Sequence, residues 1–430
     1  CMQRKVSVNL GNLVLSLSDA MDLANPLLAQ HQQRTAFVVW EMGKCANLSV
    51  NRLEKNFIAA LLHDICAISL EEKIPLLSGE VNNTEEHCIR GSILLDKIPW
   101  LKDAAQIIRC HHKEWKDWEE PIETPFVLEA QLLFLADFVE HLIDRNKYIL
   151  HQHEDIILKI KSLSGSSFKS QIVDLFLTVS EREEFWLDLV SPRLYSILLN
   201  DGPFRGTEID LSKISVMAEL FRNIIDFRSH FTATHSSGVA AAASILSNIF
   251  GLTEMETMLI EVAGNLHDLG KLAIPNSILE KPGKLTKKEM AVMKSHTYYT
   301  YSVISTIGGL QQIAEWGAYH HEKLDGTGYP FRCKADELST GSRILMVADT
   351  FTALVEDRPY RKGMSRERIT QIIKHFSDKQ LFDAKIVKLL FENFDEISSH
   401  VAEKQEVARE FYENQFAFIE KDCKLSSIAC

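Results

Sequence analysis

Apolar positions recur along most of this chain at the spacing of a buried helical face. The i, i+3, i+4, i+7 pattern is clearest in two stretches and predicts amphipathic helices there. The positions are Leu259, Val262, Ala263 and Leu266 in the second half. Phe57, Ala60 and Leu61, with Asp64 at the i+7 position, echo this spacing in the first half. Strict alternation of apolar and polar residues, which is typical of strands, is scarce. The pattern therefore predicts an all-α architecture.

A second regularity is an internal repeat of histidine and aspartate positions. Each half has a histidine, an adjacent His-Asp pair, a further histidine, an adjacent His-His pair and a later aspartate. The two series are His31, His63, Asp64, His87, His111, His112 and Asp137, and His235, His267, Asp268, His296, His320, His321 and Asp349. In both halves the first two histidines are 32 residues apart, and the third and fourth are 24 apart. This agreement predicts a tandem duplication with copies of about 200 residues.

Two groups of turn-forming residues divide the chain. Asn200-Asp201-Gly202-Pro203 is a strong turn signal and predicts the seam between the copies. We therefore expect two tandem helical domains, residues 1–205 and 206–430. The segment 162–167, of sequence SLSGSS, predicts a loop between the core of the first copy and the helices that lead to the second.

Composition and charge narrow the classes of partner. The 430-residue chain is 46% hydrophobic and 25% charged, which is typical of a globular protein with sizeable cores. Its 47 basic and 59 acidic residues give a formal net charge of −12. This balance argues against binding to duplex nucleic acid or to an anionic membrane, although a local basic pocket for a small anion is compatible with it.

Cysteine use and the apolar N-terminal stretch bear on location. The eight cysteines form no CxxC pair, which indicates free thiols in a reducing compartment. The chain contains no run of 18 apolar residues, so we expect no membrane span. The stretch from Val6 to Leu17 is interrupted by Asn9 and Asn12 and is followed by no clear cleavage site. We interpret it as an amphipathic helix and expect a cytoplasmic protein.

The repeated residues are of the types that bind transition metals. A lone histidine on an apolar helix is more often a core residue, but several convergent positions with adjacent pairs favour ligation. Imidazole nitrogens and aspartate oxygens suit iron, manganese, zinc or nickel better than calcium or magnesium. An aspartate beside a ligand histidine can place its two oxygens on two ions. Two ions can clamp both oxygens of an in-line phosphoryl displacement, so the pattern predicts a binuclear hydrolytic centre.

Longer motifs surround these residues in the second half. The segment 267–271 (HDLGK) is similar to the motif HDxGK, and 320–330 (HHEKLDGTGYP) is similar to HHExxDGxGYP. With the segments 274–286 and 357–361 (DRPYR), they resemble the HD-GYP subclass of the HD superfamily over residues 210–400. The resemblance implies the helical HD fold and hydrolysis of a bacterial cyclic dinucleotide, either cyclic di-GMP or 3′,3′-cyclic GMP-AMP.

The resemblance also assigns roles to individual residues. Two divalent ions, iron or manganese ahead of nickel or zinc, would be held by His235, His267, Asp268, His296, His320, His321 and Asp349. Asp268 would bridge the ions, and Lys271 would assist the leaving 3′ oxygen. The implied substrate contacts are Tyr329, Gly326, Gly328, Arg358 and Arg361. The glycines would allow positive φ and a close approach to phosphate, and the guanidinium groups suit phosphate or guanine.

Three positions depart from the family pattern. Phe231 stands where some members have a glutamate that supports a third metal, so the resemblance favours two ions. Gly238 replaces an arginine, and Thr352 replaces the second aspartate of the family motif DxxDAL. These departures leave the ligand set intact but affect the expected substrate preference and rate.

The first copy has the ligand residues without the rest of the site. Cys66-Ala67 stands where the second copy has Gly270-Lys271, and no DGxGYP follows His112. We expect a degenerate HD domain with a structural or regulatory role, whose ligand set suffices for a second metal site. A homodimer or a regulatory protein contact through this domain is compatible with that role. We interpret the cysteines beside the ligand motifs as buried apolar residues, with redox sensing as the alternative; they are Cys66, Cys88 and Cys110.

The leading hypothesis is a metal-dependent cyclic-dinucleotide phosphodiesterase. One alternative is another HD-type phosphohydrolase, with a single metal, acting on nucleotides; the His320-His321 pair and the GYP loop argue against it. The other is an adaptor that binds the dinucleotide without turnover. Turnover by the purified protein with added manganese or iron(II) separates the enzyme from the adaptor.

Overall fold

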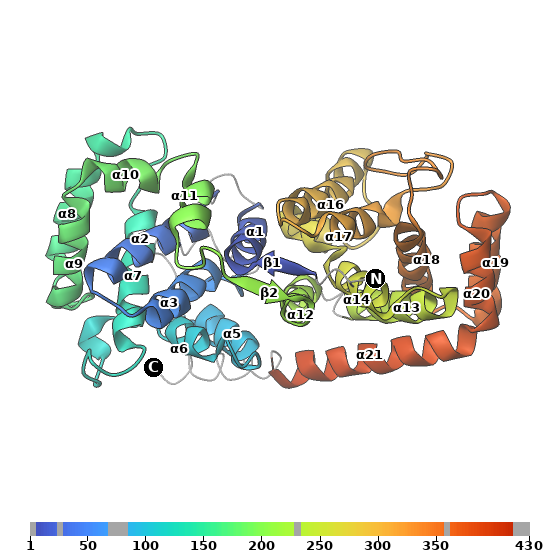
Figure 1. Cartoon of the computed structure of the whole chain (residues 1–430), viewed down its shortest axis with the longest axis horizontal. Coiled ribbons are helices and arrows are strands. Elements are labelled where there is room, and N and C mark those ends of the chain that lie inside the picture. Colours follow the sequence, from blue (N-terminus) through green and yellow to red (C-terminus); the bar gives the residue numbers. More distant parts are fainter. Residues whose placement is uncertain (1–5, 24–28, 68–84, 228–233, 357–361, 416–430) are drawn as a thin grey trace. The chain divides into compact units, whose positions relative to one another are not determined.

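The computed structural model describes residues 6–23, 29–67, 85–227, 234–356 and 362–415. Within these residues the only strands are β1 (Ser7–Asn9) and β2 (Glu208–Asp210), which pair in a two-stranded sheet. Helices make up most of the rest, so the predicted all-α architecture is confirmed (Figure 1). Among the described residues, none of the helices is both long enough and apolar enough to cross a bilayer.

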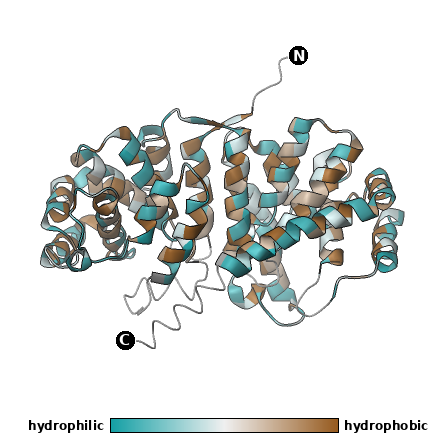
Figure 2. Ribbon diagram, turned by 90° about the horizontal axis from the view of Figure 1, so that it is seen from below, coloured by the Kyte–Doolittle hydropathy of each residue, from teal (hydrophilic) through white to brown (hydrophobic). Residues whose placement is uncertain are grey.

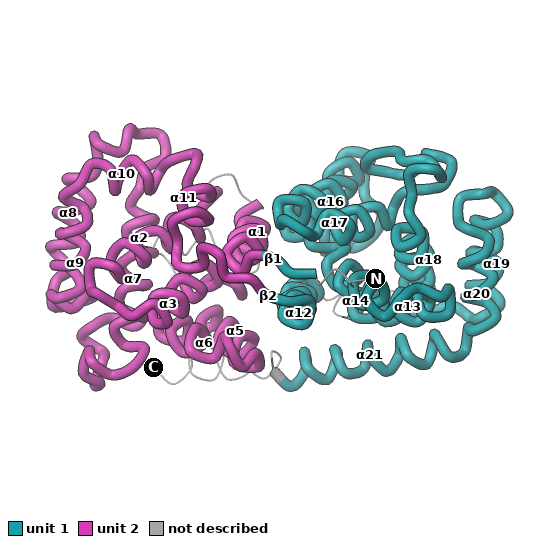
Figure 3. The backbone as a smooth tube through the Cα atoms, in the orientation of Figure 1, with its two compact units in different colours: residues 1–8, 209–430 teal, residues 9–208 magenta. Residues whose placement is uncertain are grey.

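The chain divides into two compact units (Figure 3). We call residues 9–208 the N-terminal unit. Residues 1–8 and 209–430 together form the C-terminal unit. The chain thus passes from one unit to the other within each of the two short strands. Asp201 ends the helix before the second crossing, and Gly202 caps it.

In its described residues the N-terminal unit consists mainly of helices. Its described α-helices are α1 (Leu10–Asp22), α2 (His31–Cys45), α3 (Val50–Leu62), α5 (Glu85–Asp96), α6 (Lys102–Arg109), α7 (Val127–His141), α8 (His153–Ser162), α9 (Ser170–Ser180), α10 (Glu183–Leu189) and α11 (Leu194–Asp201), with 3-10 helices η2 (Trp115–Asp117) and η3 (Ile149–His151). The loop predicted at 162–167 lies between α8 and α9.

The C-terminal unit repeats much of this order. Its described α-helices are α12 (Leu211–Phe227), α13 (His235–Phe250), α14 (Glu254–Leu266), α15 (Asn276–Leu279), α16 (Lys287–Ser305), α17 (Gln311–Ala318), α18 (Thr340–Val355), α19 (Arg366–Asp378), α20 (Ala384–Glu392) and α21 (Phe394–Gln415), with 3-10 helices η4 (Leu269–Ala273) and η5 (Tyr319–His321). Helix α13 packs against α14, α18 and α21.

The helices form where their sequences supply both an apolar face and end signals. In α14 the predicted stripe is buried, from Leu259 to Leu266. Thr253 begins this helix with a capping box, in which its hydroxyl accepts from the backbone of Glu256 and the Glu256 carboxylate accepts from the backbone of Thr253. Thr286 and Glu289 do the same for α16. Figure 2 shows hydrophobic (brown) and hydrophilic (teal) positions on different faces of the helices.

The N-terminal apolar stretch differs from its prediction. Residues 7–9 form β1, and α1 begins only at Leu10, where the Asn9 side chain accepts from the backbone N–H of Asn12. Within α1 only Asn12 and Asp19 escape full burial. The helix is therefore a core element that is buried on nearly all sides. Its buried serine hydroxyls form hydrogen bonds within the protein; Ser18, for example, donates to the carbonyl of Leu15.

Candidate metal centre

The C-terminal ligand residues lie in, or next to the ends of, helices that surround one point. His235 begins α13, His267 follows α14, and His296 lies within α16. His320 and His321 end η5, and Asp349 lies in α18. All of these side chains are buried except that of His321, which is 32% exposed. The structure thus gathers all the ligand residues predicted for the second half.

Backbone carbonyls fix the orientation of three imidazoles. The Nδ1–H groups of His267, His296 and His320 donate to the carbonyls of Gly264, Met293 and Gly317 at 2.6–2.7 Å. In each case the acceptor is three residues earlier in the chain. Nδ1 therefore carries the proton, and Nε2 presents its lone pair to the centre, as metal-binding histidines require.

The ligands form two clusters. One consists of His235, His267 and Asp268, and the other of His296, His320 and His321. In the second cluster the Nε2 atoms of His296 and His320 are 3.3 Å apart. Two nitrogens at about 2.0–2.1 Å from one ion, in tetrahedral geometry, lie about 3.3 Å from each other. The spacing of these donors therefore fits a shared divalent ion.

Two carboxylates connect the clusters. Asp268 has Oδ2 3.2 Å from Nε2 of His267 and Oδ1 3.4 Å from Nε2 of His296. Asp349 has Oδ1 3.1 Å from Nε2 of His235 and Oδ2 3.8 Å from Nδ1 of His321. Each aspartate thus turns one oxygen to each cluster, so its carboxylate could reach ions held by either one.

The protonation of His296, His321 and Asp268 suits metal binding. Burial lowers the pKa of His296 to about 4 and that of His321 to about 3, although nearby aspartates oppose the shift. Both imidazoles are therefore neutral at neutral pH and keep a lone pair for a metal. Burial alone would raise the pKa of Asp268, but His267 and Lys271 hold it well below its usual range. Asp268 is therefore a carboxylate.

A buried glutamate that the sequence analysis did not identify supports His235. Oε2 of Glu356 lies 3.4 Å from Nδ1 of His235. Its Oε1 accepts from Thr234 at 2.7 Å and from Gln405 at 3.1 Å. Burial alone would lower the pKa of His235, but its hydrogen bonds to Asp349 and Glu356 raise it to about 10. A carboxylate on the outer nitrogen of a ligand histidine orients the ring and increases its basicity.

The loop after η5 brings Tyr329 to the centre. The Tyr329 ring lies 5.0 Å from that of His321, and the Lys294 ammonium lies 4.8 Å from the Tyr329 ring. The buried carboxylate of Glu322 holds the loop by accepting from the backbone N–H groups of Phe331 and Arg332, at 2.7 and 3.0 Å. These contacts place the predicted tyrosine beside a predicted metal ligand.

The two loop glycines differ in what they allow. Gly326 has a φ of +78°, as predicted. Gly328 does not have a positive φ, and that part of the prediction was wrong. A Cβ at Gly328 would lie 2.3 Å from Cα of Glu322. Glycine is needed there because the loop packs against its own backbone.

The remaining predicted positions have mixed outcomes. Arg358, Arg361 and Phe231 lie outside the described residues. Gly238 and Thr352 lie against each other, since a Cβ on Gly238 would be 2.7 Å from Cγ2 of Thr352. The arginine and the aspartate of the family pattern are thus replaced by two small neutral residues that pack together.

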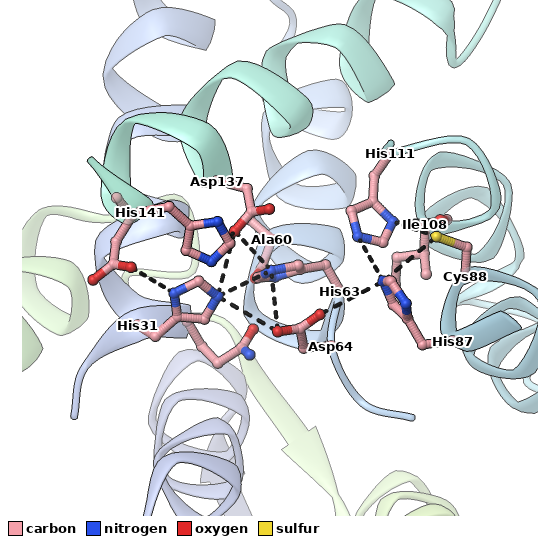
Figure 4. A network of polar contacts seen from close by, with 12 residues as sticks. His31, Ala60, His63, Asp64, His87, Cys88, Ile108, His111, Asp137 and His141 are labelled. Atoms are coloured by element: carbon pink, nitrogen blue, oxygen red, sulfur yellow. Dashed lines mark hydrogen bonds and ion pairs between the residues drawn. The ribbon is translucent and has the colours of Figure 1, made fainter. Parts of the chain in front are cut away.

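The N-terminal unit contains a similar centre (Figure 4). His31 begins α2, His63 follows α3, His87 lies in α5, His111 and His112 follow α6, and Asp137 lies in α7. Asp64 again connects two groups, with Oδ2 3.5 Å from Nε2 of His31 and Oδ1 3.8 Å from Nε2 of His87. Carbonyls three residues earlier fix the rings of His63 and His111, at 2.8 and 2.6 Å.

This second centre shares one supporting carboxylate with the first and has two additional donors, His141 and Cys88. Glu140 accepts from Nδ1 of His31 at 2.7 Å, as Glu356 supports His235. His141 stacks on His31 with ring centroids 5.1 Å apart, and its Nε2 lies 3.6 Å from Oδ1 of Asp137. Cys88 is buried beside His87. Of Glu140, His141 and Cys88, the sequence pattern had indicated only Cys88. The spacing of His141, one helical turn after Asp137, was a signal that could have identified it.

The same family matches both halves of the chain. The family model described as "HD domain" matches residues 16–158 and again residues 219–386. The chain belongs to the HD domain family. The two matches confirm the predicted pair of HD-type helical domains in tandem, and the HDxGK and GYP motifs of the second domain agree with the predicted HD-GYP type.

Known relatives and a solved structure support this assignment. The 3′3′-cGAMP-specific phosphodiesterase 1 of Vibrio cholerae is 29% identical over 397 residues, which cover 90% of this chain and 92% of that protein. The cyclic di-GMP phosphodiesterase response regulator RpfG of Xanthomonas campestris is 35% identical over 187 residues, 43% of this chain and 48% of that protein. A cyclic GMP-AMP specific phosphodiesterase of V. cholerae (V-cGAP3) has the same fold, with a TM-score of 0.62 at 22% identity, covering 90% of this chain and 98% of that one.

Proposed function

We propose that this chain is a metal-dependent phosphodiesterase that opens a 3′,3′-cyclic dinucleotide at the centre of its C-terminal unit. The observation that carries this proposal is the pair of carboxylates, Asp268 and Asp349, each facing both ligand clusters. Two clusters joined in this way suit two divalent ions, iron or manganese ahead of nickel or zinc. When bound, such ions supply an activated water and the positive charge that in-line displacement at phosphorus needs.

The chain's own residues complete the chemistry. Addition of water to one phosphodiester forms a P–O bond and breaks the bond from phosphorus to the 3′ oxygen, which takes up a proton. Lys271 is the residue placed to supply that proton, because its ammonium lies 2.6 Å from Oδ2 of Asp268, the carboxylate that faces both ligand clusters. The product is a linear dinucleotide with a 5′-phosphate.

The GYP loop and the basic segment after α18 are the proposed substrate contacts. Tyr329 lies beside His321 at the exposed edge of the centre, where its ring can stack on a base or a ribose. Gly326 and Gly328 shape the loop that carries it, and Arg358 and Arg361 would bind phosphate or guanine through their planar guanidinium groups. Their contribution stays a prediction, as does the cytoplasmic location.

Among cyclic dinucleotides we propose 3′,3′-cyclic GMP-AMP as the first substrate to test. The relative that aligns over 90% of this chain is specific for that molecule, whereas RpfG, named for cyclic di-GMP, aligns over 43%. Cyclic di-GMP presents the same phosphodiesters and is the second candidate.

The test is a panel of cyclic dinucleotides incubated with protein reconstituted with iron(II) or manganese. We expect conversion of 3′,3′-cyclic GMP-AMP to a linear product, detected by chromatography and mass spectrometry, and little conversion of a 2′,3′-linked isomer. Saturable binding of the cyclic dinucleotide without product would establish the adaptor instead. Hydrolysis of linear nucleotides alone would indicate the single-metal phosphohydrolase.

A further inference from the structure

We infer that the N-terminal unit holds a closed, zinc-type metal site in which Cys88 is a thiolate ligand beside His87, His111 and His112. These four residues each offer one ligand atom, and the four atoms lie within 4.8 Å of one another. They come from α5 and from the turn after α6, so they converge from separate helices.

The distances between the donors fit a tetrahedral ion. Nε2 of His87 is 3.4 Å from Nε2 of His111 and 3.5 Å from Sγ of Cys88. With zinc–nitrogen and zinc–sulfur bonds of about 2.0–2.1 and 2.3 Å, tetrahedral angles place two nitrogens about 3.3 Å apart and a nitrogen and a sulfur about 3.6 Å apart. Sγ also lies 3.4 Å from Nδ1 of His111, which is the ring nitrogen that donates to the carbonyl of Ile108.

His112 supplies an independent sign of a ligand. Its Nε2 is buried and has no hydrogen-bond partner among the described residues. Leaving a buried polar atom without a partner is unfavourable. The ring lies 5.0 Å from that of His87 and 4.1 Å from that of His111. A shared metal ion would satisfy this nitrogen.

The matching positions of the C-terminal unit lack these extra donors. Because His87 corresponds to His296 in the repeat, Cys88 corresponds to Thr297, whose hydroxyl donates to the carbonyl of Lys294 at 2.9 Å. In the same way His141 corresponds to Ala353, four residues after the repeated aspartate. The group around His87 thus has one more protein donor than its counterpart around His296.

An additional donor changes what a metal site can do. Catalytic zinc sites keep one position open for water or substrate, whereas structural sites are closed by four protein ligands. Three imidazoles and one thiolate complete a tetrahedral set without Asp64, whose Oδ1 is 3.8 Å from Nε2 of His87. Thiolate favours zinc over manganese. Ala67 also replaces the lysine of the other unit. The N-terminal site therefore binds a zinc-type ion that stabilises the unit and does not hydrolyse.

Cobalt(II) is the probe for this site, because thiolate ligation gives a sulfur-to-cobalt charge-transfer band in the near ultraviolet. The full chain is stripped with a chelator and titrated with cobalt under reducing conditions. We expect the wild-type protein to show this band together with the visible bands of tetrahedral cobalt. Added zinc should abolish the band, and manganese should not, since zinc binds such donors more tightly. Among the described residues no cysteine joins the C-terminal clusters, so the band reports the N-terminal site.

Two variants locate the thiolate. Cys88→Thr, which installs the residue of the other unit, should lose the charge-transfer band and lower the zinc content by about one ion per chain. Cys110→Ser, beside the same histidines, should keep both. Cobalt binding by the wild type without the band, or a band that survives in Cys88→Thr, would overturn the inference. If Cys88→Thr does not fold, the wild-type spectrum still decides the presence of a thiolate, and Cys110→Ser still tests its position. The readout is a spectrum, so it does not depend on whether the C-terminal unit hydrolyses a cyclic dinucleotide.

Discussion

Lys271 donates to Asp268 across 2.6 Å, through the same carboxylate oxygen that lies 3.2 Å from Nε2 of His267. The lysine is thus held by a carboxylate that faces both ligand clusters. Asp268 precedes η4 and Lys271 lies within it, three residues later. The short 3-10 helix therefore sets the distance between a proposed metal ligand and a proposed proton donor.

Replacing Lys271 should separate metal binding from catalysis. Lys271→Ala removes a proton donor but none of the ligand atoms, so we expect metal content to stay the same. Hydrolysis should fall by roughly 10²–10⁴-fold, the usual contribution of a general acid. The exposed Lys284 offers the control, and Lys284→Ala should hydrolyse at the wild-type rate. Equal rates for the two variants would remove Lys271 from the mechanism.

Replacing Asp268 should affect both properties. Asp268→Ala deletes the carboxylate that faces both clusters and leaves Lys271 without this partner. We expect loss of metal from the C-terminal unit and no measurable hydrolysis, checked by elemental analysis and by the cyclic-dinucleotide assay. Near-normal turnover with retained metal would show that the site is assigned incorrectly.

The glutamate behind His235 gives a milder prediction. Glu356→Gln keeps the volume of the side chain and an oxygen that accepts from Thr234 and Gln405. It removes the negative charge beside Nδ1 of His235. Loss of such an outer carboxylate typically weakens metal affinity by about 10–100-fold. Excess metal should restore hydrolysis, which identifies the effect as one on binding. Glu140→Gln, the equivalent change in the N-terminal unit, serves as the control and should not change the metal concentration that hydrolysis requires.

The GYP loop should tolerate no side chain at position 328. In Gly328→Ala the new Cβ would meet the backbone of Glu322, so the loop that carries Tyr329 must move. We expect a large loss in kcat/KM with unchanged metal content. Gly283→Ala separates contact from backbone strain: Gly283 has a φ of +111°, yet a Cβ there meets nothing within 4 Å. It should keep wild-type kcat/KM even if its stability falls.

The helical fold and the ligand set could be predicted because both leave local marks in the sequence. Ligand chemistry restricts residue types, and the repeat preserves their spacing, so His235 and His267 were recognisable from the pattern of His31 and His63. Glu356 was not, because its role depends on a tertiary contact with Thr234 and on Gln405 from α21.

Positions whose role depends on their neighbours were the hardest to predict. Gly238 and Thr352 are separate departures in the sequence but adjacent in space. Gly328 looked like a phosphate-binding glycine, while its packing against Glu322 became visible only with the loop folded. Cys88 was expected to be an ordinary buried thiol, and only the position of its sulfur beside His87 indicates a ligand.

The division of labour between the units gives the last prediction. Both units gather the ligands, but only the C-terminal unit joins them to Lys271 and Tyr329. Metal binding alone does not position a dinucleotide, and poor positioning of reacting groups costs orders of magnitude in rate. His63→Ala with Asp64→Ala should therefore leave hydrolysis within a small factor of wild type while lowering stability or altering regulation. His267→Ala with Asp268→Ala should abolish hydrolysis and leave the N-terminal cobalt band in place. Both double variants are measured for cyclic-dinucleotide turnover and for thermal unfolding. Activity that survives the second pair but disappears with the first would place the active site in the N-terminal unit.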